Sequence, residues 1–527
     1  MTPTTYGRDF AYCLKSHGGV RGFNASLWRF LLRCTLFCHS VATFLTSVSS
    51  YEGGCGFEVL FYFCALFMSA QNSLRLSPIF ASGMVLQQNA DVIFWGWGEP
   101  NKKVNIFFGW DNKMLESKVN EKGRWEVKVK TPSAGYTPYT VSICSAQDSI
   151  LLSDILIGDV WFVGGQSNMQ MNFHGNPDQP VQDAQKILLR CKHKGIRLFR
   201  VNNGYAISAS DTLTIDGKWT SASPDNVKEF SVVGYIFGEK LHELTDIPIG
   251  LVQSAHGGSS AEAWLDYETL ERFGGFDLNL ERKKIDPIWY AFEPTVLYNK
   301  MLAPMLPLTV KGVIWYQGES NVERPEQYRM LFPELVRTWR RYFADDNLPF
   351  YYVQIAPYNH QKVNSAIFRE VQLDCMRTIP NVGMVVTLDV GEADIIHPAR
   401  KEVVGERLAY WALNKVYGYS AFGCRGPEFR SMEIRDGHAF LKFDFAPNGL
   451  SFMGKQPLGF EVAGEDKVFY PAKVRITPAF WGNEGLEVWS TEVAKPVAVR
   501  YGFSNYVDGS LYNTEGLPAS SFRTDNW

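Results

Sequence analysis

The 527-residue sequence lacks the residue patterns that commonly hold metal ions. It contains no HExxH pair, and its nine cysteines form neither a CxxC pair nor a compact disulfide framework. Five of these cysteines lie within the first 64 residues, and the other four are far apart. We therefore expect no metal site in this protein.

The sequence also lacks an excess of positive charge. Its formal net charge is -3 and its pI is near 6.3. This balance argues against nucleic acid or an anionic membrane as the main partner. Hydrophobic residues make up 46% and charged residues 20%, a composition typical of globular proteins, and the length favours about three domains.

Aromatic residues, in contrast, are abundant. They make up 14% of the chain, and 15 of them are tryptophan. Aromatic rings can stack on the faces of sugars, but they also fill hydrophobic cores. Composition leaves both interpretations open, and core filling is the favoured one.

Residues 1–73 are not typical of a folded domain and are interpreted as a leader region. The apolar run Val59–Phe67 has the length of the hydrophobic part of a signal peptide, and small residues follow it near Ala70. We expect an export signal near residues 57–70 and a secreted or periplasmic protein. The basic residue nearest upstream is Arg33, so the extension before the signal is atypical, and a single anchored or disordered leader is the alternative.

Two regions show the alternation of apolar and polar residues that is typical of half-buried strands. Residues 74–152 are predicted to form a small antiparallel β-sandwich, and residues 420–527 a second β domain of this type. The clearest predicted strands are Asp91–Trp97, Val104–Phe108 and Trp125–Lys130 in the first region, and Ala439–Phe443 and Val497–Tyr501 in the second.

Residues 153–419 alternate short apolar runs with amphipathic segments, a pattern that predicts a parallel α/β sheet. One helix is expected around Tyr328–Trp339, with a kink or restart at Pro333, and another after Pro398. The predicted strands are Asp159–Val163, Ile249–Gln253, Val310–Tyr316, Tyr351–Ile355 and Met384–Leu388.

Polar and glycine-rich segments follow four of these five strands. In open parallel sheets, ligands bind outside the carboxyl ends of the strands, so the four segments are expected to converge. They are Gln166–Asn168, Ser254–Ser260, Gln317–Asn321, and Asp389 with Asp394–Pro398.

The residue types in these segments suit acyl transfer. Ser167 is the candidate nucleophile, although its surroundings do not have G-x-S-x-G spacing. His397 is the candidate base, and Asp394, three residues earlier, could orient its imidazole. Asp389, at a strand end, is the alternative orienting acid.

A tetrahedral oxyanion also needs hydrogen-bond donors. The backbone N–H of Ser167, an N–H of Gly257 or Gly258, and the side-chain amide of Asn321 could supply them. Glu319 is expected to order its loop, since a glycosidase-type acid would need a second carboxylate placed opposite it.

Four motifs together resemble the SGNH hydrolases, and most closely the sialate O-acetylesterase-like carbohydrate esterases. They are the G-Q-S-N-M of Gly165–Met169, the G-G-S of Gly257–Ser259, the G-E-S-N of Gly318–Asn321 and the D-x-x-H-P of Asp394–Pro398. The similarity extends over nearly all of residues 74–527.

This resemblance implies a Ser-His-Asp esterase that needs no cofactor and removes acetyl groups from sugar hydroxyls. The expected oxyanion donors are Gly258, with Gly257 as the alternative, and Asn321, and the expected partner is an O-acetylated sugar or glycan rather than nucleic acid or a stable membrane partner. The implied fold is a flavodoxin-like, five-stranded parallel sheet with helices, flanked by the two β domains. The alternatives are a noncatalytic glycan-binding protein and an esterase acting on xylan or pectin rather than on sialic acid.

The sequence departs from the family pattern at two places. His256 stands where tryptophan usually precedes the paired glycines, which puts a second imidazole near the site. Related sequences often have Asn-Asp-Ile-His where this chain has Asp394-Ile395-Ile396-His397. The second departure leaves the choice between Asp394 and Asp389 open.

Overall fold

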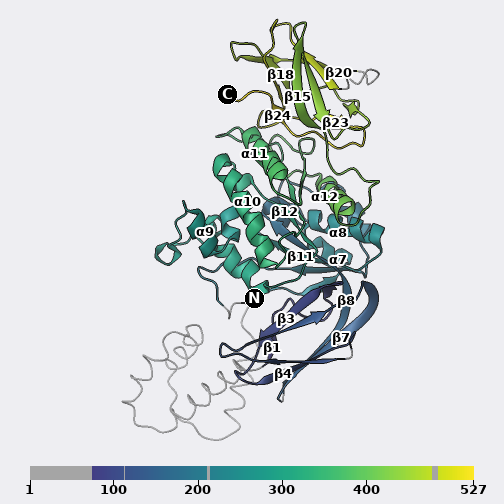
Figure 1. The fold of residues 1–527 in the computed structure, drawn as a ribbon, viewed down its shortest axis with the longest axis vertical. Coiled ribbons are helices and arrows are strands. Elements are labelled where there is room, and N and C mark those ends of the chain that lie inside the picture. Colours follow the sequence, from purple (N-terminus) through teal and green to yellow (C-terminus); the bar gives the residue numbers. More distant parts are fainter. Residues whose placement is uncertain (1–73, 112, 147, 211–213, 478–484) are drawn as a thin grey trace. The chain divides into compact units, whose positions relative to one another are not determined.

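The structure is a computed structural model that describes residues 74–527 except 112, 147, 211–213 and 478–484 (Figure 1). Residues Asn72–Trp527 form one compact unit. The leader region and the export signal predicted near residues 57–70 lie outside the described residues. Among the helices that are described, none has the length and apolar character needed to cross a membrane.

A parallel sheet of six strands lies at the centre of this unit. The five predicted strands are present, but the parallel sheet has a sixth strand, β9, which was not predicted. The expected five-stranded sheet is therefore one strand short. The sixth was missed because Arg197, which is itself buried, interrupts its apolar run. The order is β9 (Ile196–Arg200), β11 (Ile249–Ala255), β8 (Asp148–Gly165), β12 (Gly312–Tyr316), β13 (Phe350–Val353) and β14 (Val382–Val385), with β10 (Trp219–Ser221) antiparallel at the β9 edge.

The register of the central strands aligns their carboxyl ends. Gly165, the last residue of β8, is paired with Ala255 of β11 on one side and with Tyr316 of β12 on the other. The loops that follow these three strands therefore start side by side. The chain adds strands on both sides of β8, so β8 lies at the switch point where such sheets bind ligands.

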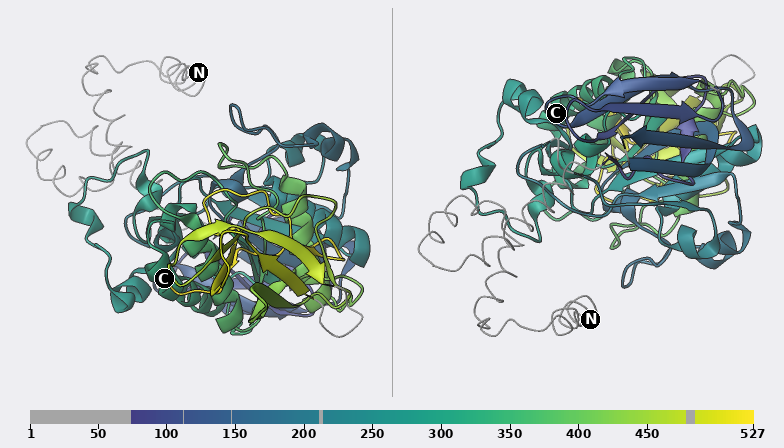
Figure 2. Two further views of the ribbon diagram at one scale, coloured as in Figure 1. Left: turned by 90° about the horizontal axis from the view of Figure 1, so that it is seen from above. Right: turned by 90° about the horizontal axis from the view of Figure 1, so that it is seen from below.

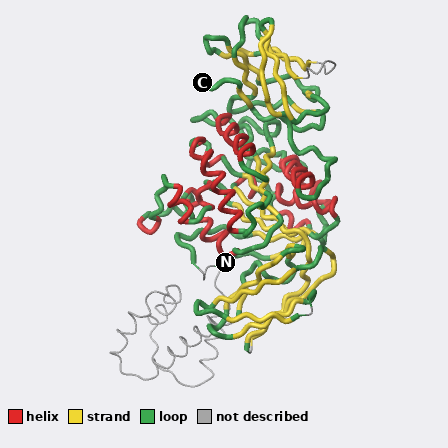
Figure 3. The backbone as a smooth tube through the Cα atoms, viewed as in Figure 1, coloured by secondary structure: helices red, strands yellow, loops and turns green. Residues whose placement is uncertain are grey.

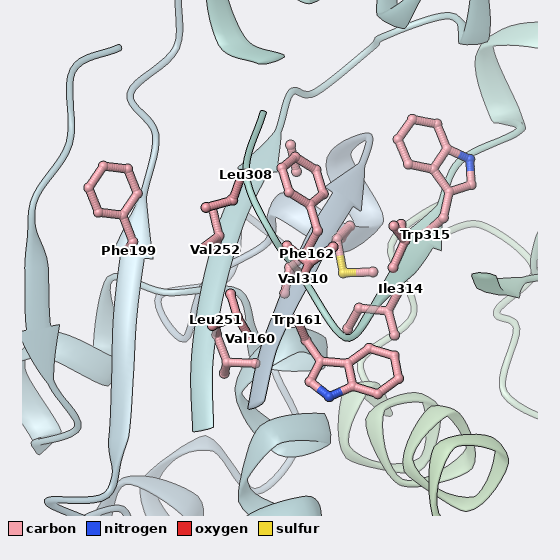
Figure 4. Close-up of a cluster of buried hydrophobic side chains, with 14 of the residues drawn as sticks. Val160, Trp161, Phe162, Phe199, Leu251, Val252, Leu308, Val310, Ile314 and Trp315 are labelled. Atoms are coloured by element: carbon pink, nitrogen blue, oxygen red, sulfur yellow. The ribbon is translucent and has the colours of Figure 1, made fainter. Parts of the chain in front are cut away.

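Apolar side chains from the central strands form the core on both faces of the sheet (Figure 4). Val160, Trp161 and Phe162 of β8 are almost fully buried, as are Leu251 and the other residues of β11. Burial on both faces explains why these strands read as continuous apolar runs rather than as alternating ones.

Helices cover the two faces of the sheet, with α10 and α11 on one side and α8 and α12 on the other (Figure 1). The predicted apolar stripe of α10 is buried from Tyr328 to Trp339, and the helix continues through Pro333, so the expected restart does not occur. The helices are α5 (Ser167–Gln170), α6 (Ala184–Arg190), α7 (Pro224–Lys228), α8 (Val232–Thr245), α9 (Tyr267–Phe273), α10 (Pro325–Tyr342), α11 (Ser365–Thr378) and α12 (Lys401–Lys415).

Strands dominate the region before the parallel sheet (yellow in Figure 3). The 18-residue strand β8 belongs both to this N-terminal region and to the parallel sheet, because its first half pairs with β7 and its second half with β11 and β12. One sheet contains β1 (Arg75–Leu76), β3 (Asp91–Trp97) and β6 (Arg124–Lys130), and the other joins β2 (Val85–Gln87), β4 (Lys103–Phe108), β5 (Met114–Lys118) and β7 (Gly135–Ser145) to β8.

The C-terminal strands form further antiparallel sheets (Figure 2). Their buried apolar side chains make a separate hydrophobic core. Arg369 of α11 reaches this region, where its buried guanidinium donates to the carbonyls of Gly502 and Ser504. The pairings are β15 (Glu428–Arg435), β16 (His438–Asp444), β21 (Gly485–Trp489) and β20 (Lys473–Thr477); β19 (Phe469–Pro471), β18 (Phe460–Ala463), β22 (Ala498–Tyr501) and β24 (Phe522–Arg523); and β17 (Leu450–Ser451) with β23 (Tyr512–Asn513).

Candidate active site

Ser167 lies at the point where β8 turns sharply into helix α5. Gly165 has a φ of +140°, and a Cβ placed there would lie 2.2 Å from the carbonyl oxygen of Tyr316. Only glycine fits this turn without displacing β12. Ser167 is the first residue of α5, so its backbone N–H has no acceptor within that helix.

His397 contacts the Ser167 hydroxyl directly. Its Nε2 lies 2.7 Å from Ser167 Oγ, although 230 residues separate the two in the sequence. The other ring nitrogen, Nδ1, is hydrogen-bonded to the side-chain carbonyl Oε1 of Gln179. A carbonyl oxygen can only accept, so Nδ1 carries the proton and the lone pair of Nε2 faces the serine hydroxyl.

The imidazole of His397 is neutral over most of the pH range. Burial lowers its pKa to about 4, and the nearby Lys401 acts in the same direction. A neutral imidazole beside a serine hydroxyl can accept its proton. The pair therefore has both the geometry and the protonation state of a nucleophile and its base.

The structure brings neither candidate aspartate to His397. Asp394 is exposed, and its carboxylate makes no hydrogen bond or ion pair with any described residue. Asp389 is buried and receives two hydrogen bonds from Arg407, of 2.8 and 2.7 Å. Burial alone would raise the pKa of Asp389, but the Arg407 guanidinium outweighs it and holds that pKa below the ordinary value.

Gln179 was not predicted as a site residue. It lies in the loop after α5, where Asn176 and Gln179 form an isolated β-bridge, and Gln182 N–H donates to the Ala399 carbonyl at 3.0 Å. These contacts hold the loop against the segment that carries His397. No motif or periodicity marks Gln179, so only the tertiary structure reveals its contact.

The glycine loop after β11 lies beside Ser167. A Cβ placed on Gly257 would lie 3.7 Å from the Ser167 Cβ. The Gly257 N–H is already donated to Gln170 Oε1 at 2.8 Å, whereas the N–H of Gly258, which has a φ of +71°, has no acceptor among the described residues. Of the two predicted glycine donors, Gly258 is thus the one still available to a ligand.

Asn321 is buried in a hydrogen-bond network behind the glycine loop. Its Nδ2 donates to Glu262 Oε2 at 2.9 Å, and its Oδ1 accepts from the Ala261 N–H at 3.0 Å and from Gln317 Nε2 at 2.7 Å. Within the described part of the chain, no hydrogen bond joins Asn321 to Ser167 or His397. These contacts tie the loop after β12 to the loop after β11.

A second buried network links the serine loop to the histidine loop. Asn168 Nδ2 donates to Glu319 Oε1 at 2.6 Å and to the Ile396 carbonyl at 3.1 Å, and Asn168 Oδ1 accepts from Lys401 Nζ. Burial raises the pKa of Glu319 and lowers that of Lys401 to about 7. One sequence signal marks this network: Lys401 lies on the apolar stripe of α12, three residues before Val404.

His256, the unusual residue before the paired glycines, uses both ring nitrogens in contacts outside the Ser167–His397 pair. Its Nδ1 lies 2.8 Å from the Gly257 carbonyl oxygen, and its Nε2 lies 2.6 Å from the Tyr290 hydroxyl. Burial lowers the pKa of His256, which favours the neutral ring. Nδ1–H therefore donates to Gly257, and Nε2 accepts from Tyr290.

Comparison with known proteins places this site in a family. A family model described as carbohydrate esterase, sialic acid-specific acetylesterase, matches residues 157–414. The sialate O-acetylesterase of Mus musculus is 27% identical over 446 residues, covering 73% of this chain and 82% of the relative. The Homo sapiens enzyme is 27% identical over 404 residues, covering 69% of this chain and 75% of the relative.

A solved structure gives the same assignment. The crystal structure of a carbohydrate acetylesterase from Xanthomonas citri is 35% identical to this chain, with a TM-score of 0.76. The alignment covers 86% of this chain and all of the other. The chain therefore belongs to the sialate O-acetylesterase-like carbohydrate esterases and is a carboxylic ester hydrolase.

Proposed function

We propose that this protein removes O-acetyl groups from sugar hydroxyls through an acetyl-enzyme formed on Ser167. The observation that carries the proposal is the 2.7 Å contact between Ser167 Oγ and His397 Nε2, at the switch point of the parallel sheet. The arrangement corresponds to the nucleophile and base of an SGNH-type hydrolase.

The reaction begins with proton transfer. His397 Nε2 takes the proton of the Ser167 hydroxyl while Oγ attacks the carbonyl carbon of the acetyl ester. The oxyanion of the tetrahedral intermediate accepts hydrogen bonds from the N–H groups of Ser167 and Gly258. The imidazolium then gives its proton to the sugar oxygen, the ester C–O bond breaks, and acetyl-Ser167 remains.

Deacylation repeats the same steps with water as the nucleophile. His397 takes a proton from water, and the resulting hydroxide attacks the acetyl carbonyl. The second tetrahedral intermediate collapses, the proton on His397 passes to Ser167 Oγ, and acetic acid leaves and loses its proton to water. The enzyme is then in its starting state.

In this proposal, Gln179 holds the His397 imidazole in the productive tautomer. An amide carbonyl can fix the Nδ1–H tautomer as an aspartate does, but it carries no negative charge to stabilise the imidazolium. The motif-based assignment of Asp394 to this position stays a prediction without a supporting contact. The role of Asn321 as an oxyanion donor likewise stays a prediction.

The proposed substrate is an O-acetylated sialic acid or another O-acetylated sugar. The mammalian relatives are named sialate O-acetylesterases, and the Xanthomonas relative is named a carbohydrate acetylesterase. The division into residues 74–152, 153–419 and 420–527, and the export of the protein, stay predictions from the sequence.

Acetate release tests the proposal. Wild-type protein should hydrolyse a chromogenic acetate ester and release acetate from at least one of a panel of O-acetylated sialic acids, xylan fragments and pectin fragments. Ser167→Ala should abolish both reactions. A wild type that binds glycans but is inert on every ester would identify a noncatalytic glycan-binding protein instead.

A further inference from the structure

A cluster of exposed aromatic side chains lies next to the glycine loop of the active site. Trp289 is 60% exposed, Phe292 41% and Tyr205 40%. Most of the large aromatics among the described residues are buried, and several tryptophans, among them Trp161 and Trp315, are fully buried. The cluster therefore differs from the general use of aromatic residues in this protein.

Several contacts fix the segment that carries these rings to the glycine loop. The Ser260 N–H donates to the Ala291 carbonyl at 3.2 Å, and the Ser260 hydroxyl donates to the Phe292 carbonyl at 3.3 Å. A Cβ placed on Gly258 would lie 3.7 Å from the ring of Phe292. Phe292 thus packs beside the very glycine whose N–H is available to a ligand.

His256 anchors a second ring of the cluster. Tyr290 donates its hydroxyl proton to His256 Nε2 at 2.6 Å, and its ring stacks on that of Tyr205 with centroids 4.5 Å apart. Tyr205 comes from a different part of the chain, the loop after β9. His256, the residue that departs from the family pattern, therefore holds the stacked Tyr290 and Tyr205 rings in place rather than acting on the ester.

A series of contacts connects these rings to the nucleophile. Ser167 lies against Gly257, Gly258 lies against Phe292, and Phe292 lies against Trp289, with ring centroids 5.9 Å apart. Exposed apolar surface that is continuous with a catalytic site is characteristic of a ligand-binding surface. Because the family acts on carbohydrates, the ligand that reaches this surface is the sugar part of the ester.

Pyranose rings fit such a surface because one face of the ring presents C–H groups and the hydroxyls lie at its edge. Aromatic faces bury the C–H face, and the hydroxyls stay in water. Four residues, Tyr205, Trp289, Tyr290 and Phe292, make up what we call the aromatic platform. We propose that the aromatic platform binds a sugar ring of the substrate chain adjacent to the ring that carries the acetyl group. This inference rests on the proposed function.

The test compares a sugar ester with an ester that has no sugar. The variants are Trp289→Ala and Phe292→Ala, and the control is Phe107→Ala, which removes a ring of similar exposure, 39%, from strand β4. The substrates are 4-nitrophenyl acetate, an O-acetylated xylo-oligosaccharide and an O-acetylated sialoside. We expect each platform variant to lower kcat/KM for the preferred sugar ester by about tenfold more than for 4-nitrophenyl acetate, mainly through KM, because the variant loses the ring on which the sugar stacks; tenfold corresponds to about 1.4 kcal/mol.

Binding measurements distinguish a failure of the aromatic platform from a failure of the proposed function. The dissociation constant of each acetylated oligosaccharide is measured by calorimetry in the Ser167→Ala background, where it is not hydrolysed. Weaker binding in the platform variants and unchanged binding in Phe107→Ala would support the platform. Equal losses on all three esters, or unchanged binding of both oligosaccharides, would overturn it. A Ser167→Ala protein with full esterase activity would instead overturn the proposed function.

Discussion

The side-chain carbonyl of Gln179 accepts a hydrogen bond from Nδ1 of His397, on the side of the imidazole opposite Ser167. A carboxylate in this position would hold the tautomer and also stabilise the imidazolium that forms during catalysis. The side-chain amide of Gln179 can hold the tautomer but has no negative charge to stabilise the imidazolium. This difference has consequences for mutation and for pH dependence.

The first prediction concerns the Gln179 contact itself. Gln179→Leu removes the acceptor of Nδ1–H, so the imidazole loses its fixed tautomer and orientation, and kcat should fall by about a hundredfold. Gln182→Ala is the matched control on the same loop, because the Gln182 side chain bonds to Asp183 rather than to His397. Steady-state kinetics on a chromogenic acetate measures both. An active Gln179→Leu enzyme would show that another group orients His397.

The second prediction concerns the acid that the motif implies. Asp394 is exposed and makes no polar contact with described residues, so Asp394→Asn should change kcat/KM by no more than a few fold. An enzyme in which Asp394 orients the imidazole would instead lose on the order of 10⁴ in kcat. Measuring Asp394→Asn beside Gln179→Leu assigns the role, since the larger loss identifies the residue that holds Nδ1.

The third prediction concerns pH. His397 acts as a base only when it is unprotonated, and its pKa is lowered to about 4, first by burial and then by Lys401. Activity should therefore be full at pH 6, where an ordinary imidazole would be largely protonated, and should fall as the pH drops through about 4. The measurement is kcat/KM against pH, with circular dichroism to confirm folding at each point.

A designed variant gives this pH prediction its control. Gln179→Glu places a carboxylate beside Nδ1–H, which stabilises the imidazolium and raises the pKa of His397. The acidic limb of the profile should then move upward from about pH 4. A wild-type limb near pH 6.5 that Gln179→Glu leaves unmoved would contradict the environment described for His397.

The fourth prediction concerns stability. Asp389 and Arg407 form a buried ion pair with hydrogen bonds of 2.8 and 2.7 Å, so Asp389→Ala leaves the guanidinium without its partner. The free energy of unfolding should fall by about 3–5 kcal/mol. Glu116→Gln, at the exposed pair with Lys103, is the control and should cost less than about 1 kcal/mol. Denaturant unfolding measures both, and equal effects would contradict the assignment of Asp389 to structure.

The sequence predicted those parts of the site that local pattern determines. Ser167 and His397 follow strands whose apolar runs are visible without the structure, and paired glycines mark the turn at Gly165. Because parallel strands end at one edge, predicting the strands was enough to bring these residues together. The carbohydrate esterase assignment, reached from the four motifs, is confirmed by the comparisons.

Contacts made by loops and by buried polar groups could not be predicted in this way. Gln179 reaches His397 across 218 residues from a loop without any motif. Lys401 lies on the apolar stripe of α12, where a lysine is unexpected, and its partner Asn168 lies in another segment. Strand β9 was missed because Arg197 interrupts its apolar pattern, and only the tertiary structure shows that Arg197 pairs with Asp154.

In the proposed mechanism, Ser167 carries the acetyl group during turnover. The most direct measurement is acid quenching of the enzyme during hydrolysis of a chromogenic acetate, followed by peptide mass mapping. We expect an acetyl group on the peptide that contains Ser167, and no acetyl group on the same peptide of Ser167→Ala. Full turnover by Ser167→Ala, or acetylation confined to another residue, would contradict it.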